Sequence, residues 1–259
     1  MDLGAARAGL AFDHMSEHAA DEQRDRLADT LRLAEALGGE ALTIPAAGRR
    51  IADDVINFAH ANNVTQIIIG KSQRSRWFEM VNGSVVHDLL RRATGASVAR
   101  LTQDWLWQPM GAQDPAYWLV STTDGAEAVA GGFNASLRDY GRFGMLLAND
   151  GVRDGQAIIP REFLLDATDP QRQPPAFRPR VATPFMGYGY QTWLLPYATR
   201  TFALQGIHGQ TVYVQPASQI VMVQTAVHTA PSGRHDLRPY HYRQALWEGV
   251  LRSLGGRVD

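Results

Sequence analysis

The chain has 259 residues, of which 45% are hydrophobic and 20% are charged, and its formal net charge is -1. This composition is ordinary for a globular protein and allows one large or two small domains with a buried core. The near-neutral charge offers no global attraction to nucleic acid or to an anionic membrane, and the absence of cysteine excludes disulfides, a thiolate nucleophile and a Cys-type zinc site.

The beginning of the chain shows no basic stretch followed by an apolar run, and no segment approaches the ~20 apolar residues of a membrane span. We therefore expect a cytoplasmic protein with no membrane partner and no nucleic-acid partner. Lys71 is the only lysine in the sequence, so any chemistry that depends on lysine has a single candidate.

Residues 1–20 show no clear periodicity, and we interpret them as a disordered lead-in. Residues 21–93 then alternate between helical and strand patterns. The elements predicted there are a helix over 21–37, a strand over 41–44, a helix over 51–61, a strand over 64–69 and a helix from 84 to about 92. The run 64–69 is apolar throughout, which is typical of a strand buried on both faces of a parallel sheet. This order of elements predicts a partial doubly wound parallel α/β segment.

A candidate nucleotide site lies between the last strand and the last helix of this segment. Gly70, Lys71 and Ser72 follow the strand directly, and Gly83 and Ser84 open the helix. Backbone N–H groups and the helix dipole at Ser84 would favour a phosphate group, and Lys71 would add positive charge. A solvated basic loop, with Ser84 as a plain N-cap, explains the same residues equally simply.

Residues 22–93 resemble the universal-stress-protein domain of the potassium-responsive sensor histidine kinases. The stretches that carry the resemblance are Leu33–Gly38, Asn63–Ser72 and Gly83–Val86. The resemblance implies an adenine nucleotide as the ligand, and Gln73 stands where nucleotide-binding members of that superfamily carry a glycine. Such domains begin with a strand, a helix and a second strand. None is recognisable before Asp21, so we expect a domain that is cut at its front.

Residues 94–259 show a different pattern, with antiparallel strands and a packed C-terminal helix. The predicted elements are a helix over 97–105, an extended segment over 117–120, a helix over 136–147, a helix over 160–167, an irregular loop over 169–186, a strand over 188–195, a hairpin with strands over 211–215 and 220–223, and a helix over 240–254. We expect Leu246, Val250 and Leu254 to form the inner face of the last helix. The overall class predicted for the chain is α/β, or α+β taken as a whole.

This second segment resembles the C-terminal part of serine β-lactamase-like hydrolases, in the branch of the aminohexanoate-dimer hydrolases and esterases. The stretches that carry the resemblance are Trp107–Gly111, Ala116–Trp118, Ser136–Gly144, Gly187–Tyr190 and Gly206–Gln210. The third sequence motif of that family lies on the strand beside the nucleophile, and Gly206 falls at its place. The resemblance implies that the backbone N–H of Ile207 would belong to the oxyanion hole.

The sequence lacks the nucleophile that this resemblance implies. These hydrolases acylate a serine in a Ser-x-x-Lys motif and move protons with a tyrosine in a Tyr-x-Asn type motif. The only lysine, Lys71, follows Ile68 by three residues, so the sequence contains no Ser-x-x-Lys, and it contains no Tyr-x-Asn or Tyr-x-Ser either. We therefore expect a truncated hydrolase fragment fused to a partial stress-protein-like domain and not catalytically competent alone.

Two other interpretations of the sequence remain open. One is a nucleotide-binding sensor or regulatory module in which the C-terminal half serves as a scaffold. The other is an amide or ester hydrolase that another chain completes. In each case the partner is a small amide, ester or nucleotide, and two incomplete sheets would leave open edges through which the protein could associate with itself.

A metal site is not expected. His208, His228, His235 and His241 have spacings that match no closed zinc pattern, and Asp236 lies in the same polar loop region. We assign no metal to the chain, and no cofactor other than the candidate adenine nucleotide.

Overall fold

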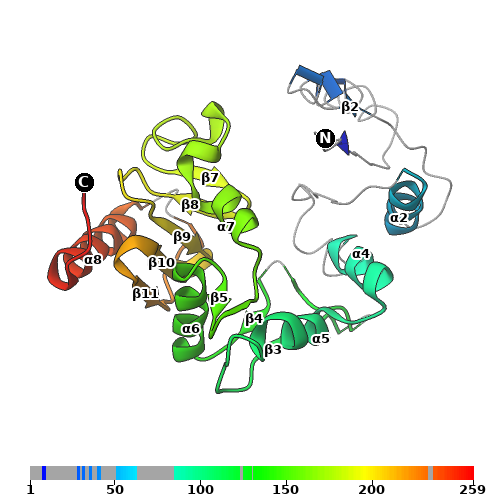
Figure 1. Cartoon of the computed structure of the whole chain (residues 1–259), viewed down its shortest axis with the longest axis horizontal. Helices are drawn as coiled ribbons and strands as arrows, with labels where there is room; N and C mark the ends of the chain where they lie inside the picture. The colour runs from blue at the N-terminus through cyan, green and yellow to red at the C-terminus, as the bar shows by residue number, and fades with distance from the viewer. Residues whose placement is uncertain are drawn as a thin grey trace. The chain divides into compact units, whose positions relative to one another are not determined.

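The computed structural model describes residues 8–9, 28–29, 31–32, 35–36, 40–41, 51–62, 85–122, 125–129, 131–232 and 236–259. The chain divides into two compact units, of which unit 1 comprises residues 1–98 and 120–129 and unit 2 comprises residues 99–119 and 130–259. The chain contains both helices and strands (Figure 1), and the α/β class predicted from the sequence is confirmed.

Unit 1 contains a parallel pair of short strands, β1 (Ala8–Gly9) and β2 (Glu40–Ala41). The described residues between positions 28 and 36 are helical, so a helix lies between the two strands in the chain. A parallel pair with a helix in its connection is the crossover unit of α/β domains. We expected no strand before Asp21, and Ala8–Gly9 corrects that expectation. A strand of two residues is too short to display the alternation by which strands are predicted.

Two helices of unit 1 pack against each other. Helix α2 (Ile51–Ala61) has the bounds predicted from the sequence, and α4 (Val85–Thr94) begins within a residue of its predicted start. Ala52, Val55 and Leu89 form their buried contact, so unit 1 has a small hydrophobic core of its own.

The centre of unit 2 is a five-stranded antiparallel sheet with the order β11-β10-β9-β8-β7. Its strands are β7 (Gly187–Gly189), β8 (Thr192–Leu194), β9 (Phe202–Gln205), β10 (Thr211–Gln215) and β11 (Ile220–Gln224). The predicted hairpin of β10 and β11 is confirmed. The single strand expected over 188–195 is instead two strands, because Tyr190 and Gln191 take positive φ angles of 48° and 66° and form a two-residue turn.

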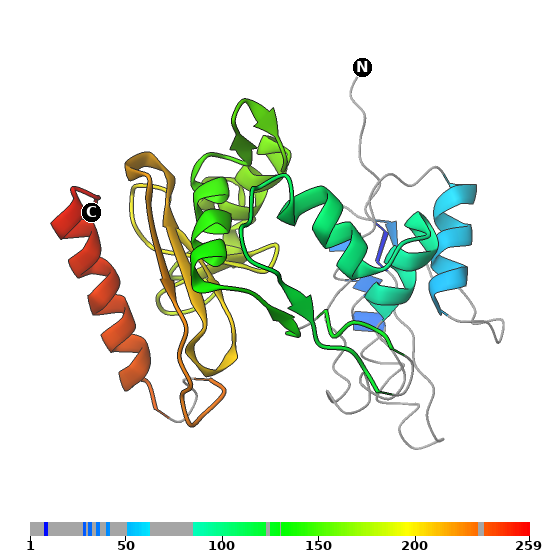
Figure 2. The ribbon, with the colours of Figure 1, turned by 90° about the horizontal axis from the view of Figure 1, so that it is seen from below.

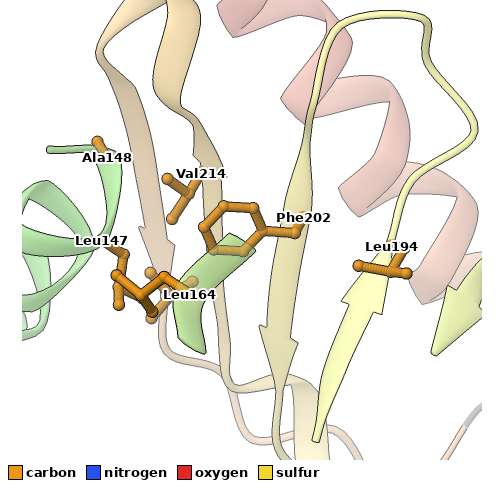
Figure 3. Close-up of a cluster of buried hydrophobic side chains, with 7 residues drawn as sticks. Leu147, Ala148, Leu164, Leu194, Phe202 and Val214 are labelled. Carbon is orange, nitrogen blue, oxygen red and sulfur yellow. The ribbon is translucent and has the colours of Figure 1, made fainter. Parts of the chain in front are cut away.

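Helices cover both faces of this sheet. Helices α6 (Leu137–Ala148) and α7 (Arg161–Thr168) lie on one face, and α8 (Arg238–Leu254) lies on the other. Figure 2 shows the strands between α6 and α8. Because side chains alternate along a strand, each strand supplies two cores: Phe202 and Val214 face α6 and α7 (Figure 3), whereas Ala203 and Tyr213 face α8.

The face that α8 buries differs from the predicted one. Leu246 and Leu254, expected inside, are 55% and 67% exposed, whereas Trp247 and Leu251 are fully buried. Trp247 stacks on Tyr213 with ring centroids 5.2 Å apart. The helix is therefore rotated by about one residue from the expected orientation. Because a tryptophan buries more apolar area than a leucine, α8 packs the neighbouring stripe, which contains Trp247, against the sheet.

The remaining elements lie outside the five-stranded sheet and the helices that cover it. They are α5 (Val98–Thr102), the π-helical turn η1 (Gln103–Trp107), the pair β3 (Tyr117–Trp118) and β4 (Phe133–Asn134), the pair β5 (Val152–Arg153) and β6 (Gln156–Ala157), and short 3-10 turns at 170–172 and 175–177. Trp105, at the end of the helix predicted over 97–105, is 63% exposed. The wider π-helical turn changes the helical phase after Thr102. Among the described residues, no helix is both long and apolar enough to cross a membrane.

Candidate oxyanion-side site

The segment predicted to carry the oxyanion donor is a sharp turn at the end of β9. Gly206 continues the strand in an extended conformation, and its N–H donates to the carbonyl oxygen of Gln210 at 2.8 Å. Ile207 then begins the short turn η4 (Ile207–Gly209), which is interrupted by the non-helical conformation of His208. The backbone N–H of Ile207 follows strand β9, and the side chain of Ile207 is 40% exposed. Its role as an oxyanion donor stays a prediction.

His208 fixes the turn through its backbone. Its φ angle is 58°, in the left-handed region that non-glycine residues rarely adopt. Its N–H donates to the carbonyl oxygen of Pro231 at 3.1 Å, and the N–H of His228 donates to the His208 carbonyl oxygen at 3.0 Å. These two hydrogen bonds hold the strained residue against the segment that follows β11.

The ring of His208 is oriented by the same segment. Its Nδ1 lies 2.7 Å from the carbonyl oxygen of His228. A carbonyl oxygen can only accept a hydrogen bond, so Nδ1 carries a proton. In the neutral imidazole, Nε2 is then the unprotonated nitrogen. The ring is thus held in one tautomer by the backbone.

Gly209 and Gln210 complete the connection to the following segment. Gly209 has a φ of 94°, and a Cβ at this position would lie 2.6 Å from the His228 ring, so only glycine fits. The side-chain amide of Gln210 bonds to both backbone groups of Ala226: Nε2 donates to the carbonyl oxygen, and Oε1 accepts from the N–H at 3.3 Å. The whole turn 206–210 is therefore braced by residues 226–231.

Behind the turn, β9 is anchored to α8 through a buried arginine. The guanidinium of Arg243 donates to Oε1 of Gln205 at 2.9 Å and lies 5.5 Å from the ring centroid of Tyr240. Burial raises the pKa of the Tyr213 hydroxyl, and burial is also the main cause that raises the pKa of Tyr240 to about 12. Both phenols are therefore protonated at neutral pH, and neither can act as a proton-accepting phenolate.

The residues of the candidate nucleotide site, Gly70, Lys71, Ser72, Gly83 and Ser84, lie outside the described residues. The predicted strand over 64–69 also lies outside them. Within the described stretches, no group of three or more histidine, aspartate or glutamate side chains is close enough to hold a metal ion. His208 and His228 do meet, but through hydrogen bonds to backbone groups and not through a shared metal site.

Some residues that support the turn were not identified from the sequence. Gln205, Gln210 and Arg243 position β9 and the turn. They carried no sequence signal because their partners are 16 to 38 residues away. His228 was considered only as a metal ligand.

The comparisons with known proteins concern the chain as a whole. The family model described as Beta-lactamase matches residues 1–246. The 6-aminohexanoate-dimer hydrolase of Paenarthrobacter ureafaciens is 25% identical over 182 residues, which are 69% of this chain and 44% of that protein. The chain thus spans less than half the length of this curated relative.

The chain also resembles solved structures, of which two are described here. A Bacillus anthracis protein provisionally named a 6-aminohexanoate-dimer hydrolase superposes with a TM-score of 0.56 and 21% identity, covering 81% of this chain and 57% of that one. A Bacteroides dorei protein provisionally named a β-lactamase has a TM-score of 0.43 and 17% identity, covering 78% of this chain and 67% of that one. The first likeness agrees in fold with the mixed helices and antiparallel strands of unit 2. With a family model matched over most of its length, the chain belongs to the beta-lactamase family.

Proposed function

We propose that this chain is a partial serine hydrolase of the amide- and ester-cleaving type, which supplies the oxyanion side of an active site and does not acylate substrate by itself. The observation that carries the proposal is the single lysine of the sequence. Lys71 is preceded at the required distance by Ile68, so the chain has no Ser-x-x-Lys motif. The braced turn at Gly206 and Ile207 supports the other half of the proposal, because it places a backbone donor at a strand end.

Acyl transfer by this family needs an activated serine, a proton-transfer group and an oxyanion donor. Of these, the turn at Ile207 would supply the oxyanion donor, whereas the sequence contains no serine in a Ser-x-x-Lys motif. Burial raises the pKa of Tyr213 and of Tyr240, which disfavours either hydroxyl as a proton-accepting phenolate. A donor without a nucleophile stabilises no tetrahedral intermediate, because none is formed.

The test is a hydrolysis and labelling experiment on the purified chain. We expect no cleavage of an activated ester or a short linear amide above a heat-treated control, and no labelling of serine by a fluorophosphonate probe. A burst of product together with a labelled serine would overturn the proposal.

A second experiment tests completion by another chain. The part of the Paenarthrobacter ureafaciens hydrolase that this chain does not match would be added as a separate polypeptide. If this chain can supply the oxyanion side, activity should appear in the mixture. It should be lost with Ile207→Pro, which removes the backbone N–H, and kept with Ile207→Ala, which retains it. Equal activity of the two variants would show that Ile207 is not the donor.

We further propose that residues 22–93 form a partial universal-stress-protein-like domain that binds an adenine nucleotide. Strand β2 and the packed helices α2 and α4 lie in this range and support an α/β unit of this kind. The match of the Beta-lactamase family model to residues 1–246 includes this region as well, so the nucleotide titration is the deciding experiment. ATP binding should weaken with salt and with Lys71→Ala or Ser84→Ala. Unchanged affinity in both variants would contradict a site in this loop.

A further inference from the structure

A surface cavity of about 550 Å³ lies in unit 2 beside helix α6. Residues of α6 form one wall, and Met110, Val152 and Arg153 contribute to the rest of the lining. This volume is within the range of small-molecule sites, about 300–1,000 Å³. The turn 206–210 contributes no residue to the lining. The cavity is therefore separate from the candidate oxyanion-side site, and what it binds is independent of the proposed function.

The apolar part of the lining is largely buried. Met110 and Leu146 are 1% and 4% exposed, and Met145 is 37% exposed. Val152 of β5 is partly buried and lines the same cavity. Methionine side chains are flexible and polarisable, so they adapt to apolar groups of different shape. This part of the cavity suits a hydrocarbon chain, which would lose contact with water on binding.

The polar part of the lining is positively charged. It includes Arg138, Arg142 and Arg153, and among the described residues no aspartate or glutamate lines the cavity. Asp139 pairs with Arg142 at 2.8 Å, and Asp154, whose side chain is 88% exposed, pairs with Arg153 at 3.2 Å. Two aspartates thus accompany three arginines, which leaves an excess of positive charge at the cavity. This excess favours an anion.

Two of the three guanidinium groups are held in place by the fold. Nη1 of Arg142 donates to Oδ1 of Asp139 at 2.8 Å, and Nη2 donates to Oε1 of Gln113. These bonds use two of the five N–H groups of the guanidinium. The guanidinium of Arg153 lies against Gly111, where a Cβ would overlap it. Groups that are already positioned lose less conformational entropy when a ligand binds.

We propose that this cavity binds an organic carboxylate with a short hydrocarbon chain. The carboxylate would meet the arginines, and the chain would lie on Met110 and Leu146. Guanidinium groups bind planar carboxylates through paired N–H donors, whereas an inorganic anion would leave the apolar part of the cavity in water. Among the described residues, no aromatic side chain on which a nucleobase could stack lines the cavity, which favours an aliphatic carboxylate over a nucleotide.

The test is a titration of the full chain with hexanoate, followed by NMR of isotope-labelled methionine methyl groups. The signals of Met110 and Met145 should shift with a dissociation constant of about 1–10 mM. Met186 and Met222 lie in the core beneath α8, so their signals should not shift and serve as internal references. Hexanamide, which has the same chain without the charge, and inorganic phosphate should both bind more weakly. Octanoate should bind up to about fourfold more tightly per added methylene.

Two variants test the charge of the lining. Arg138→Gln removes an exposed positive charge and should weaken hexanoate binding about three- to tenfold. Asn149→Asp is nearly isosteric, adds a negative charge to the lining and should also weaken binding. Arg252→Gln changes an exposed arginine of α8 and should have no effect. Unshifted signals of Met110 and Met145, equal binding of hexanoate and hexanamide, phosphate binding as tight as that of hexanoate, or unchanged affinity in either cavity variant would overturn the proposal.

Discussion

At the scale of single residues, the strongest anchor described in unit 2 is a buried carboxylate. Asp139 is fully buried and accepts hydrogen bonds from the backbone N–H groups of Gln113 and Asp114 at 3.0 and 2.9 Å, and from Ser136 at 3.0 Å. Arg142 donates to it at 2.8 Å. Burial opposes the charge on Asp139, but the four hydrogen bonds outweigh it and lower the pKa of the carboxyl.

We predict that Asp139→Ala lowers the free energy of unfolding by about 3 kcal/mol, because it removes the ion pair with Arg142 and leaves the backbone N–H groups of Gln113 and Asp114 without this acceptor. Urea unfolding measures the change. Asp154→Ala, which removes an 88% exposed carboxylate, is the control and should cost no more than about 0.5 kcal/mol.

The same residue sets a pH dependence. The pKa of Asp139 is lowered in the folded state, so its stabilisation is fully present above the unfolded aspartate pKa of about 3.9 and is lost as the pH falls through the lower folded value. The stability difference between the natural chain and Asp139→Asn should therefore narrow in acid below that range. A difference that stays constant down to acid unfolding would show that the charge of Asp139 is not what stabilises the fold.

At the scale of elements, helix α6 approaches the sheet through a glycine. A Cβ on Gly144 would lie 2.4 Å from Cγ1 of Val221, whereas a Cβ on Gly141 of the same helix would meet nothing within 4 Å. The two glycines thus have opposite roles: one allows the helix to sit close to β11, and the other only lowers the helix propensity.

We predict that Gly144→Ala destabilises unit 2 by about 1–3 kcal/mol through overpacking. Gly141→Ala should instead stabilise it by up to about 1 kcal/mol, because alanine is the better helix former. Opposite shifts of the midpoint in parallel urea titrations are the expected result. A gain of stability in both variants would mean that α6 moves easily relative to β11.

Helix α8 provides a second comparison within one element. Leu251 is fully buried against the sheet and Leu246 is largely exposed. Leu251→Ala should cost about 2–5 kcal/mol in unfolding free energy, and Leu246→Ala should stay within about 0.5 kcal/mol. Equal losses of unfolding free energy in the two variants would indicate that Leu246 belongs to the inner face, as predicted from the sequence.

These elements also show how much of the structure could be predicted from the sequence. The start of the helix predicted over 136–147 was readable from the sequence because capping depends on residues three apart: the Asp139 N–H donates to the Ser136 hydroxyl. The face of α8 was misassigned because two neighbouring apolar stripes compete, and the choice depends on contacts with a distant strand. The bracing of the 206–210 turn by Gln210 and His228 was not predictable for the same reason, since its partners come from another part of the chain.

At the scale of the whole molecule, the buried clusters of the described residues fall within one unit or the other. One cluster of unit 1 contains Ala52, Val55 and Leu89, and the two clusters of unit 2 lie on either face of its sheet. We predict that differential scanning calorimetry of the full chain shows two transitions and not one, because a single cooperative transition requires one shared core. Val55→Ala should shift only one of them. One sharp transition that moves as a whole with this variant would show that the two units unfold together.

The stack of Trp247 on Tyr213 gives the protein a built-in optical label. The indole is completely shielded from water and joins α8 to the central strand β10, with the phenol ring 5.2 Å away. The emission maximum of Trp247 should therefore lie toward short wavelengths for as long as the helix remains on the sheet. Over the same range, Tyr213 should transfer excitation energy to the indole. When the helix detaches, the emission should shift to the red and the transfer should stop. Because the chain has six tryptophans, release of the last helix can be followed as the difference in fluorescence between the natural chain and Trp247→Phe.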